Sequence, residues 1–121
     1  MSERDLEFEV GFFEGVYKRG KRDTRVIEIL GHLYTKTGKI TEGLRMDRTL
    51  VRLEPENALA HYNLACSLAL KKRKKEAVAS LENAVSLGYS DLAWMCRDPD
   101  LESLEGYHAF DALIERLRHI L

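Results

Sequence analysis

The sizes of the side chains along this chain repeat with a period of 34 positions, and this repeat constrains the fold most strongly. Small residues recur at some matching positions, and large apolar residues recur at others. A small residue lets two helices approach closely, whereas a large one fills the space beside them. The pattern is typical of stacked helical hairpins. The matching pairs are Leu30 and Leu64, Gly31 and Ala65, Gly43 and Ala77, and Val51 and Val85.

Apolar residues at three- and four-residue steps predict two helices in each repeat. The whole chain holds two prolines, so little interrupts these helices. Gly38 and Gly88 each follow a predicted helix end, where a left-handed backbone conformation is common. The predicted helices cover 24–37, 40–53, 58–70 and 75–87.

The ordered set of leucine, small and aromatic positions over residues 24–90 resembles the tetratricopeptide repeat (TPR) family. The resemblance implies an all-α fold, a right-handed α-solenoid of TPR helical hairpins with a C-terminal capping helix. We expect a single TPR-like domain over 1–121, with repeat 1 at 24–57 and repeat 2 at 58–90. The residues that carry the resemblance are Leu30, Gly31, Tyr34, Gly43 and Pro55 in the first repeat, and Tyr62, Asn63, Leu64, Ala65, Ala77, Leu81 and Ala84 in the second.

Both flanks of the two repeats carry apolar faces, and a lone hairpin cannot bury its own face. We expect residues 3–19 to form the second helix of a partial repeat. We expect residues 91–121 to form a degenerate repeat, because Pro99 interrupts the helix that begins near residue 91. Asp98 and Pro99 instead fit the cap and first position of a new short helix. We expect the last helix, 107–120, to cap the stack.

Charge and composition exclude several classes of protein. Lys and Arg total 19 and Asp and Glu total 20, so the net charge of -1 excludes a globally basic nucleic-acid-binding protein. The chain starts without an apolar run, and no stretch approaches the ~18 apolar residues of a membrane helix. Two cysteines are too few for a disulfide scaffold. We therefore expect a soluble, cytoplasmic protein that does not contact membranes.

The motifs of common catalytic sites are missing from this sequence. It has no glycine-rich phosphate loop, no GxSxG and no HExxH. His61 and Cys66 lie five positions apart on one predicted helix, so they do not share a face as metal ligands would. We expect no enzyme activity, no cofactor, and no metal site among His32, His61, Cys66 and Cys96.

The resemblance implies a binding surface. In TPR proteins the first helices of successive repeats line a concave groove, and residues there are not needed for hairpin packing. We expect this groove to bind a peptide or helix of another protein, with Asn63 and Arg97 placed to hold a carboxylate or a backbone group. The predicted groove residues are Arg25, Glu28, His32, Leu59, Tyr62, Asn63, Cys66 and Arg97.

Some TPR proteins hold the carboxylate at a peptide C-terminus with two lysines, two asparagines and an arginine. The resemblance places Asn63 and Arg97 at two of these five positions. Glu28, His32 and Ala93 stand at the other three. Because a glutamate repels a carboxylate, we do not expect this binding mode.

A run of five cations offers an alternative binding surface. Such a run attracts phosphates or acidic proteins, so this chain is alternatively a cationic docking module for an anionic partner such as RNA. Since no aromatic residues are interleaved with the cations, we do not expect sequence-specific nucleic-acid binding. The acidic stretch 91–121 has the opposite charge to this run, and we expect this polarity either to orient a partner or to promote weak head-to-tail self-association. The run consists of Lys71, Lys72, Arg73, Lys74 and Lys75.

Overall fold

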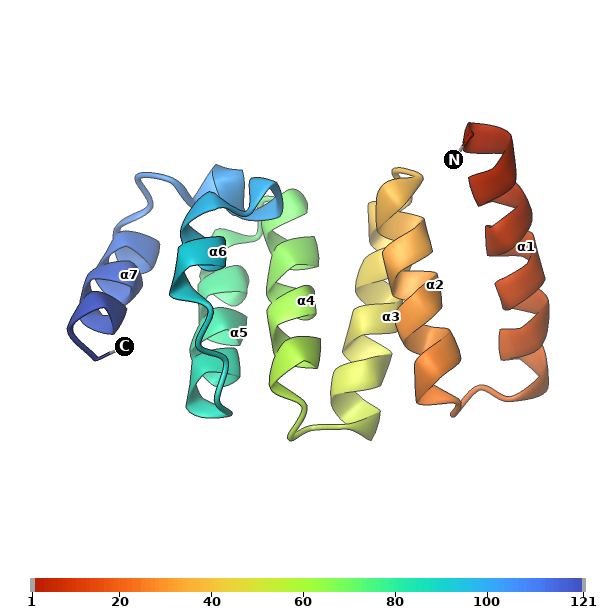
Figure 1. Cartoon of the computed structure of the whole chain (residues 1–121), viewed down its shortest axis with the longest axis horizontal. Helices are drawn as coiled ribbons and strands as arrows, with labels where there is room; N and C mark the ends of the chain where they lie inside the picture. The colour runs from red at the N-terminus through yellow and green to blue at the C-terminus, as the bar shows by residue number, and fades with distance from the viewer. Residues whose placement is uncertain (1, 121) are drawn as a thin grey trace. The chain divides into compact units, whose positions relative to one another are not determined.

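A computed structural model describes residues 2–120, and every regular element among them is a helix (Figure 1). The predicted all-α fold is confirmed, and the helix bounds fall within one residue of the predicted ones. The elements are α1 (Glu3–Arg19), α2 (Thr24–Lys36), α3 (Ile40–Leu53), α4 (Ala58–Leu70), α5 (Lys74–Ser86), α6 (Leu92–Arg97), the 3-10 helix η1 (Pro99–Leu104) and α7 (His108–Ile120).

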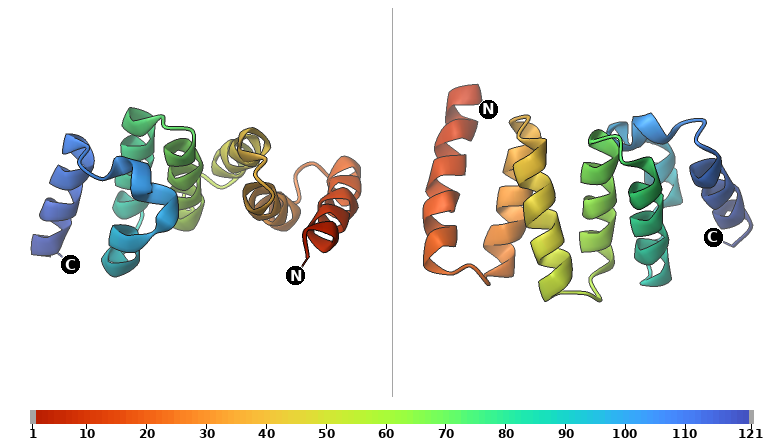
Figure 2. Two further views of the ribbon diagram at one scale, coloured as in Figure 1. Left: turned by 90° about the horizontal axis from the view of Figure 1, so that it is seen from above. Right: turned by 180° about the vertical axis from the view of Figure 1, so that it is seen from behind.

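The chain divides into two compact units between Pro55 and Glu56, close to the predicted boundary between the repeats. Unit 1 contains α1, α2 and α3, and unit 2 contains α4 to α7 with η1. In each unit, the two helices of the repeat lie side by side as an antiparallel hairpin, α2 with α3 and α4 with α5 (Figure 2). The expectation of one domain over 1–121 stays a prediction.

Polar side chains cap the N-termini of α2 and α4, the first helices of the two repeats. Asp23 Oδ1 accepts from the backbone N–H groups of Arg25 and Val26, and Asn57 Oδ1 accepts from that of Ala60. These bonds satisfy donors that the first turn of a helix leaves without a backbone partner. They also fix where α2 and α4 begin.

The second helix of each hairpin follows a tight turn instead of a side-chain cap. In repeat 1 the turn places Gly38 at φ 80°, as predicted, and in repeat 2 the matching position is Lys72 at φ 60°. A left-handed conformation is strained for a lysine and easy for a glycine. The first residues of the basic run, Lys71 and Lys72, therefore also form the hairpin turn of repeat 2. Gly88, after α5, has φ 110°, which agrees with its predicted role.

The unit 1 hairpin closes where two glycines face each other. A Cβ at Gly43 would lie 3.1 Å from Thr35 Oγ1 and 3.4 Å from the Gly31 carbonyl oxygen. The Thr35 hydroxyl donates to that carbonyl at 3.0 Å, so the space is already occupied. In α1, Glu14 accepts a hydrogen bond of 2.6 Å from the Tyr34 hydroxyl, which ties α1 to α2.

Alanines take the place of these glycines in unit 2. Ala65 and Ala77 are fully buried at the positions that match Gly31 and Gly43. The 3-10 helix begins with Pro99 after the cap Asp98, as predicted, and packs on α4. The last helix α7 contacts α5 and α6, so it covers this end of unit 2 as the predicted capping helix. The apolar side chains most deeply buried in unit 2 include Leu68, Leu81, Met95, Leu101, Leu104, Leu113 and Leu117.

A bilayer-spanning helix is not found between residues 2 and 120, because no helix in that range is both long and apolar enough.

The glycine contact predicts a measurable cost for a large side chain. We expect Gly43→Leu to lower the free energy of unfolding by about 1–3 kcal/mol, because the added atoms overlap Thr35 and the backbone at Gly31. Urea unfolding followed by circular dichroism measures the change. The matched control is Gly11→Ala in α1, where an added Cβ meets nothing within 4 Å. This control gains about 0.5–1 kcal/mol from helix propensity. Equal stability of Gly43→Leu and wild type would show that the helices do not approach closely there.

Candidate functional site

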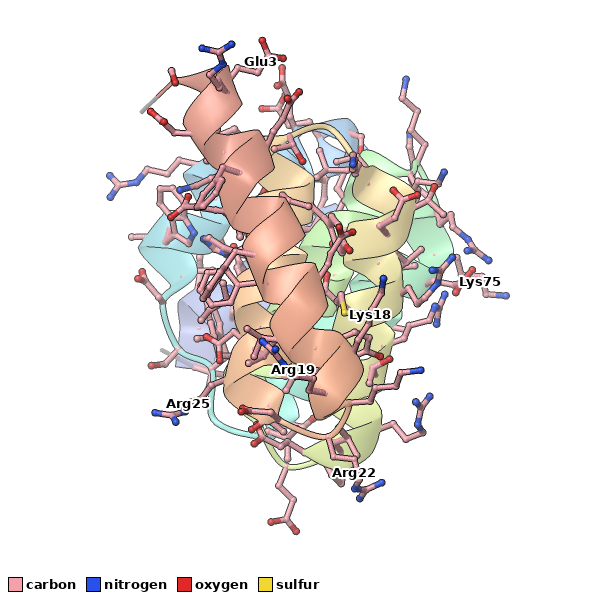
Figure 3. The ribbon with its side chains drawn as sticks, turned by 90° about the vertical axis from the view of Figure 1, so that its right-hand side faces the viewer. Glu3, Lys18, Arg19, Arg22, Arg25 and Lys75 are labelled. Carbon is pink, nitrogen blue, oxygen red and sulfur yellow. The ribbon has the colours of Figure 1, made fainter. Side chains whose placement is uncertain are left out.

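Three predicted groove residues of unit 1 share an open face of α2. Arg25, Glu28 and His32 recur at helical spacing and are all exposed, as is Ile29 between them with 38% of its surface accessible. None of these four side chains has a hydrogen bond or ion pair with another residue in the described part of the chain. Arg25 extends away from the ribbon (Figure 3). We call Arg25, Glu28, Ile29 and His32 the α2 face.

The matching face of α4 in unit 2 is covered, and this corrects part of the prediction. Tyr62 is only 3% exposed and Cys66 is also buried, so neither lines an open groove. The Tyr62 ring stacks on that of Tyr89, with 4.2 Å between ring centroids and 6° between planes. Its hydroxyl donates to Asp98 Oδ2 at 2.7 Å. Tyr62 and Cys66 are packing residues here because the chain folds back over them.

Asp98 holds this covering segment in place. Its buried carboxylate accepts from the Tyr62 hydroxyl and, at 3.6 Å, from the Cys66 thiol through Oδ2. Its other oxygen accepts from the backbone N–H of Asp100 at 3.0 Å. Ser103 adds a hydrogen bond of 2.8 Å to the carbonyl of Ala69. We call Tyr62, Cys66, Asp98 and Asp100 the Asp98 network.

Burial raises the pKa of three tyrosine hydroxyls, those of Tyr34 in unit 1 and of Tyr62 and Tyr89 in unit 2. Burial, followed by the hydrogen bond to Asp98, raises the pKa of Tyr62 far above its usual value near 10. Burial also raises the pKa of Tyr89. The pKa of Tyr34 rises because of its burial and then its hydrogen bond to Glu14. A hydroxyl that stays protonated donates a hydrogen bond and cannot act as a base, so these groups serve packing.

Among residues 2–120, side-chain atoms able to bind a metal ion form one cluster, which lies in the Asp98 network. The thiol of Cys66 and carboxylate oxygens of Asp98 and Asp100 lie within 4.8 Å of one another. The Asp98 carboxylate already accepts the Tyr62 hydroxyl and the Cys66 thiol, so a cation there would have to displace both donors. One soft thiol with two hard carboxylates is also an uncommon set for zinc. The expectation of no metal site stays a prediction.

The remaining predicted groove residues of unit 2 are more accessible. Leu59 is exposed and Asn63 is half-buried on α4. Arg97 is exposed on α6, and its guanidinium carbon lies 5.8 Å from the centroid of the Trp94 ring. Arg97 also borders an open pocket of about 290 Å³. The pocket is lined by Met95, Cys96, Arg97, Asp98, Pro99, Leu101, Glu102, Glu105 and Phe110.

The basic run is partly engaged within unit 2. The Arg73 guanidinium pairs with Glu76 at 3.0 Å, and the Lys74 ammonium lies 5.9 Å from the centroid of the Tyr107 ring. Lys71, Lys72 and Lys75 are exposed. The run therefore has a structural role in the hairpin turn and beside Tyr107, the residue before α7. Its binding of an anionic partner stays a prediction.

Sequence reasoning missed two features that the structure reveals. The buried contacts of Asp98 were not predicted beyond its role as a cap, because no local pattern signals a partner 36 positions away. The exposed face of α1 was also missed. Phe8 and Phe12 lie four positions apart and outside the apolar stripe that packs on α2, and this spacing was the available signal.

No protein-family model matches the chain. A curated relative, a chloroplastic protein from Arabidopsis thaliana, is 32% identical over 89 residues. The aligned region makes up 71% of this chain and 27% of the relative, so the chain spans about a quarter of the relative's length.

Comparison with solved structures supports the fold. The crystal structure of MamA superposes with a TM-score of 0.67 at 20% sequence identity. The match covers 87% of this chain and 66% of the MamA chain. Since MamA is a TPR protein, the chain has a TPR-like helical-repeat fold.

The Asp98 network predicts that one hydroxyl stabilises unit 2. We expect Tyr62→Phe to lower the free energy of unfolding by about 1.5–3 kcal/mol, because the Asp98 carboxylate loses a donor while it stays buried. Urea unfolding at neutral pH measures the loss. Tyr17→Phe is the matched control, since the Tyr17 hydroxyl has no partner among residues 2–120, and it leaves stability within about 0.5 kcal/mol of wild type. Equal effects of the two changes would contradict the role of Asp98.

The raised tyrosine pKa values predict a stability loss in alkali. The unfolded chain releases tyrosine protons near pH 10, whereas the folded chain retains that of Tyr62 to higher pH. The contribution of each such tyrosine to the free energy of unfolding is therefore complete below about pH 10. Above that pH it falls by about 1.4 kcal/mol per pH unit. Unfolding between about pH 10 and pH 12 should show a shallower decline in Tyr62→Phe than in wild type. Parallel declines would contradict this prediction.

Proposed function

We propose that the chain is a non-enzymatic scaffold that binds a peptide or helix of another protein on the α2 face. The observation that carries this proposal is an exposed isoleucine among charged side chains that have no described partners. Such a face combines apolar area for affinity with charges for specificity. The TPR-like fold supports the proposal, because helical-repeat proteins typically use their helix faces for binding.

A comparison of the two repeats supports this choice of surface. Positions 34 apart match Glu28 with Tyr62 and His32 with Cys66. In unit 2 the residues at these positions are buried under the segment that contains Asp98 and η1, whereas in unit 1 they are exposed. The covering segment brings Asp98, Leu101 and Leu104 into buried positions. A face of this type therefore accommodates a segment with an acidic group and leucines.

The charges of the α2 face favour an acidic, apolar partner segment. Arg25 attracts a carboxylate, His32 adds a hydrogen-bond donor, and Ile29 offers apolar contact area. Glu28 disfavours a carboxylate placed directly beside it, which sets where along the face the partner's acid binds. In unit 2, taken by itself, Leu59, Asn63 and Arg97 are proposed as residues that contact a protein partner.

The basic run remains the alternative surface, with RNA or an acidic protein as its partner. Its support is the exposure of Lys71, Lys72 and Lys75. Arg73 and Lys74 already interact within unit 2, which leaves fewer cations for a partner. The α2 face is therefore the preferred proposal.

As the compartment we propose the cytoplasm, which the chloroplastic relative does not support.

The two surfaces predict opposite results from surface substitutions. Crosslinking in native lysate identifies a bound protein, and calorimetric titration with the crosslinked segment measures affinity. We expect Ile29→Glu to weaken binding at least about tenfold, because it places a second acid at the centre of the face. A double variant, Lys72→Gln with Lys75→Gln, should change affinity less than about twofold.

The reverse pattern would assign binding to the basic run and overturn the proposal. Circular dichroism of both variants controls for folding, which we expect to be intact because all three side chains are exposed. Tyr62→Ala is unsuitable for this test. Its buried ring is part of the unit 2 core, so loss of binding would report loss of structure.

A further inference from the structure

The turn between α1 and α2 carries a cluster of exposed cations. Residues 18–25 hold five cations and one acid, and all five cationic side chains are exposed. None of the five has a hydrogen bond or ion pair with another side chain in the part of the chain that the structure describes. Figure 3 labels four of them, which lie at the end of α1 farther from Glu3. We call this cluster the cationic turn, and it consists of Lys18, Arg19, Lys21, Arg22 and Arg25.

The stability of the two helices explains only part of the cationic turn. Lys18 and Arg19 lie in the last turn of α1, where the helix dipole favours cations. Lys21, Arg22 and Arg25 lie just before α2 or in its first turn, where the dipole disfavours cations. Repulsion among like charges that are close together adds to this cost. The fold therefore gives no reason for three of the five cations.

The same turn recurs twice more in the chain without these cations. Asp23, Asn57 and Asp91 are spaced 34 apart, and each caps the helix that follows by accepting a backbone N–H. Residues 52–59, which match the cationic turn, hold one cation and two acids, and residues 86–93 hold one acid and no cation. A cap at this position is thus enough to start the helix. The cations of the cationic turn are not required by the repeat.

The cationic turn adjoins the α2 face, and Arg25 belongs to both. Ile29 lies four positions after Arg25, which is about one helical turn along α2. We propose that the cationic turn binds the acidic part of the protein segment whose apolar part contacts Ile29. The partner segment then has several Asp or Glu residues next to apolar ones, and its acids lie at the N-terminal end of α2. This inference rests on the proposed function of the α2 face.

The surroundings of the cationic turn favour an acidic protein segment over nucleic acid. Glu14 precedes the cluster on α1 and Glu28 follows it on α2, so the cationic surface is short. Nucleic acids are bound along longer tracks of cations, with aromatic side chains on which the bases stack. Residues 18–29 contain no aromatic residue, and Ile29 instead offers contact area to an aliphatic side chain. Carboxylates also match the paired donors of an arginine.

Fluorescence anisotropy with three labelled probes of equal charge tests the class of ligand. The acid–leucine peptide has four acids followed by two leucines, the acid–serine peptide has serines in place of the leucines, and the third probe is a uridine RNA with four phosphates. At about 50 mM salt, we expect the acid–leucine peptide to bind at least about threefold more tightly than either other probe. RNA binding of equal or higher affinity would overturn the choice of a protein segment. Absence of saturable binding of the acid–leucine peptide would overturn the whole proposal.

Charge reversal locates the contact with the probe's acids. Lys21→Glu with Arg22→Glu should weaken binding of the acid–leucine peptide at least about tenfold, because acids then face acids. Acids near the start of α2 suit its dipole, so the melting temperature should hold or rise. The matched control is Lys36→Glu with Lys39→Glu, which makes the same change of charge at exposed positions near the other end of α2. We expect the control to change the affinity less than about threefold. Equal losses in the two variants would show that net charge alone matters and would overturn the proposal.

A neutral substitution in the α2 face separates this inference from the proposed function. Ile29→Ser removes apolar area without adding charge and should weaken binding of the acid–leucine peptide at least about threefold. A loss with Ile29→Ser but not with Lys21→Glu and Arg22→Glu would overturn the role of the cationic turn and leave the α2 face as the binding surface. A loss with the charge reversal alone would retain the cationic turn as the site that binds acids and would overturn the proposed function of the α2 face. Losses in both variants support both proposals.

Discussion

Both units depend on a point where two antiparallel helices meet without bulky side chains between them. In unit 1 the point is formed by Gly31 and Gly43, where an added Cβ would lie 3.1 Å from Thr35 Oγ1. In unit 2 the buried Ala65 and Ala77 take the same positions. Close contact between the two helices lets the larger apolar residues on either side interlock. This packing fixes the position of the two helices in the hairpin, and the helices carry the surface residues of each unit.

The two hairpins share a backbone pattern but differ in what their first helices present. The exposed charges of the α2 face correspond to Tyr62 and Cys66 in α4, which are buried beneath the segment that Asp98 anchors. Repeat symmetry therefore predicts the position of a surface but not its accessibility. The difference arises because Pro99 follows directly after the short helix α6 and its cap Asp98, so the chain turns into η1 and packs on α4.

Local rules were enough to predict the helices and most of their ends. Helical periodicity, the cap at Asp98 and the left-handed Gly38 each depend on a few neighbouring residues, which one sequence displays. The burial of Tyr62 could not be predicted this way, because it depends on a carboxylate 36 positions further on. Three residues of the α2 face, Arg25, Glu28 and His32, were predicted as groove residues through the resemblance to TPR proteins, whereas the exposed Ile29 was not. The exposed Phe8 was missed because the apolar stripe that faces α2 already explains why α1 forms a helix.

Nuclear Overhauser effects between protons of the isotope-labelled chain test the central packing constraint most directly. We expect cross-peaks from the Hα protons of Gly43 to the side chains of Tyr34 and Thr35, because a Cβ there would lie 3.6 Å from Tyr34 Cβ and 3.1 Å from Thr35 Oγ1. Assigned spectra without these cross-peaks, while α2 and α3 keep helical chemical shifts, would contradict it. The two helices would then form without the close approach on which the hairpin depends.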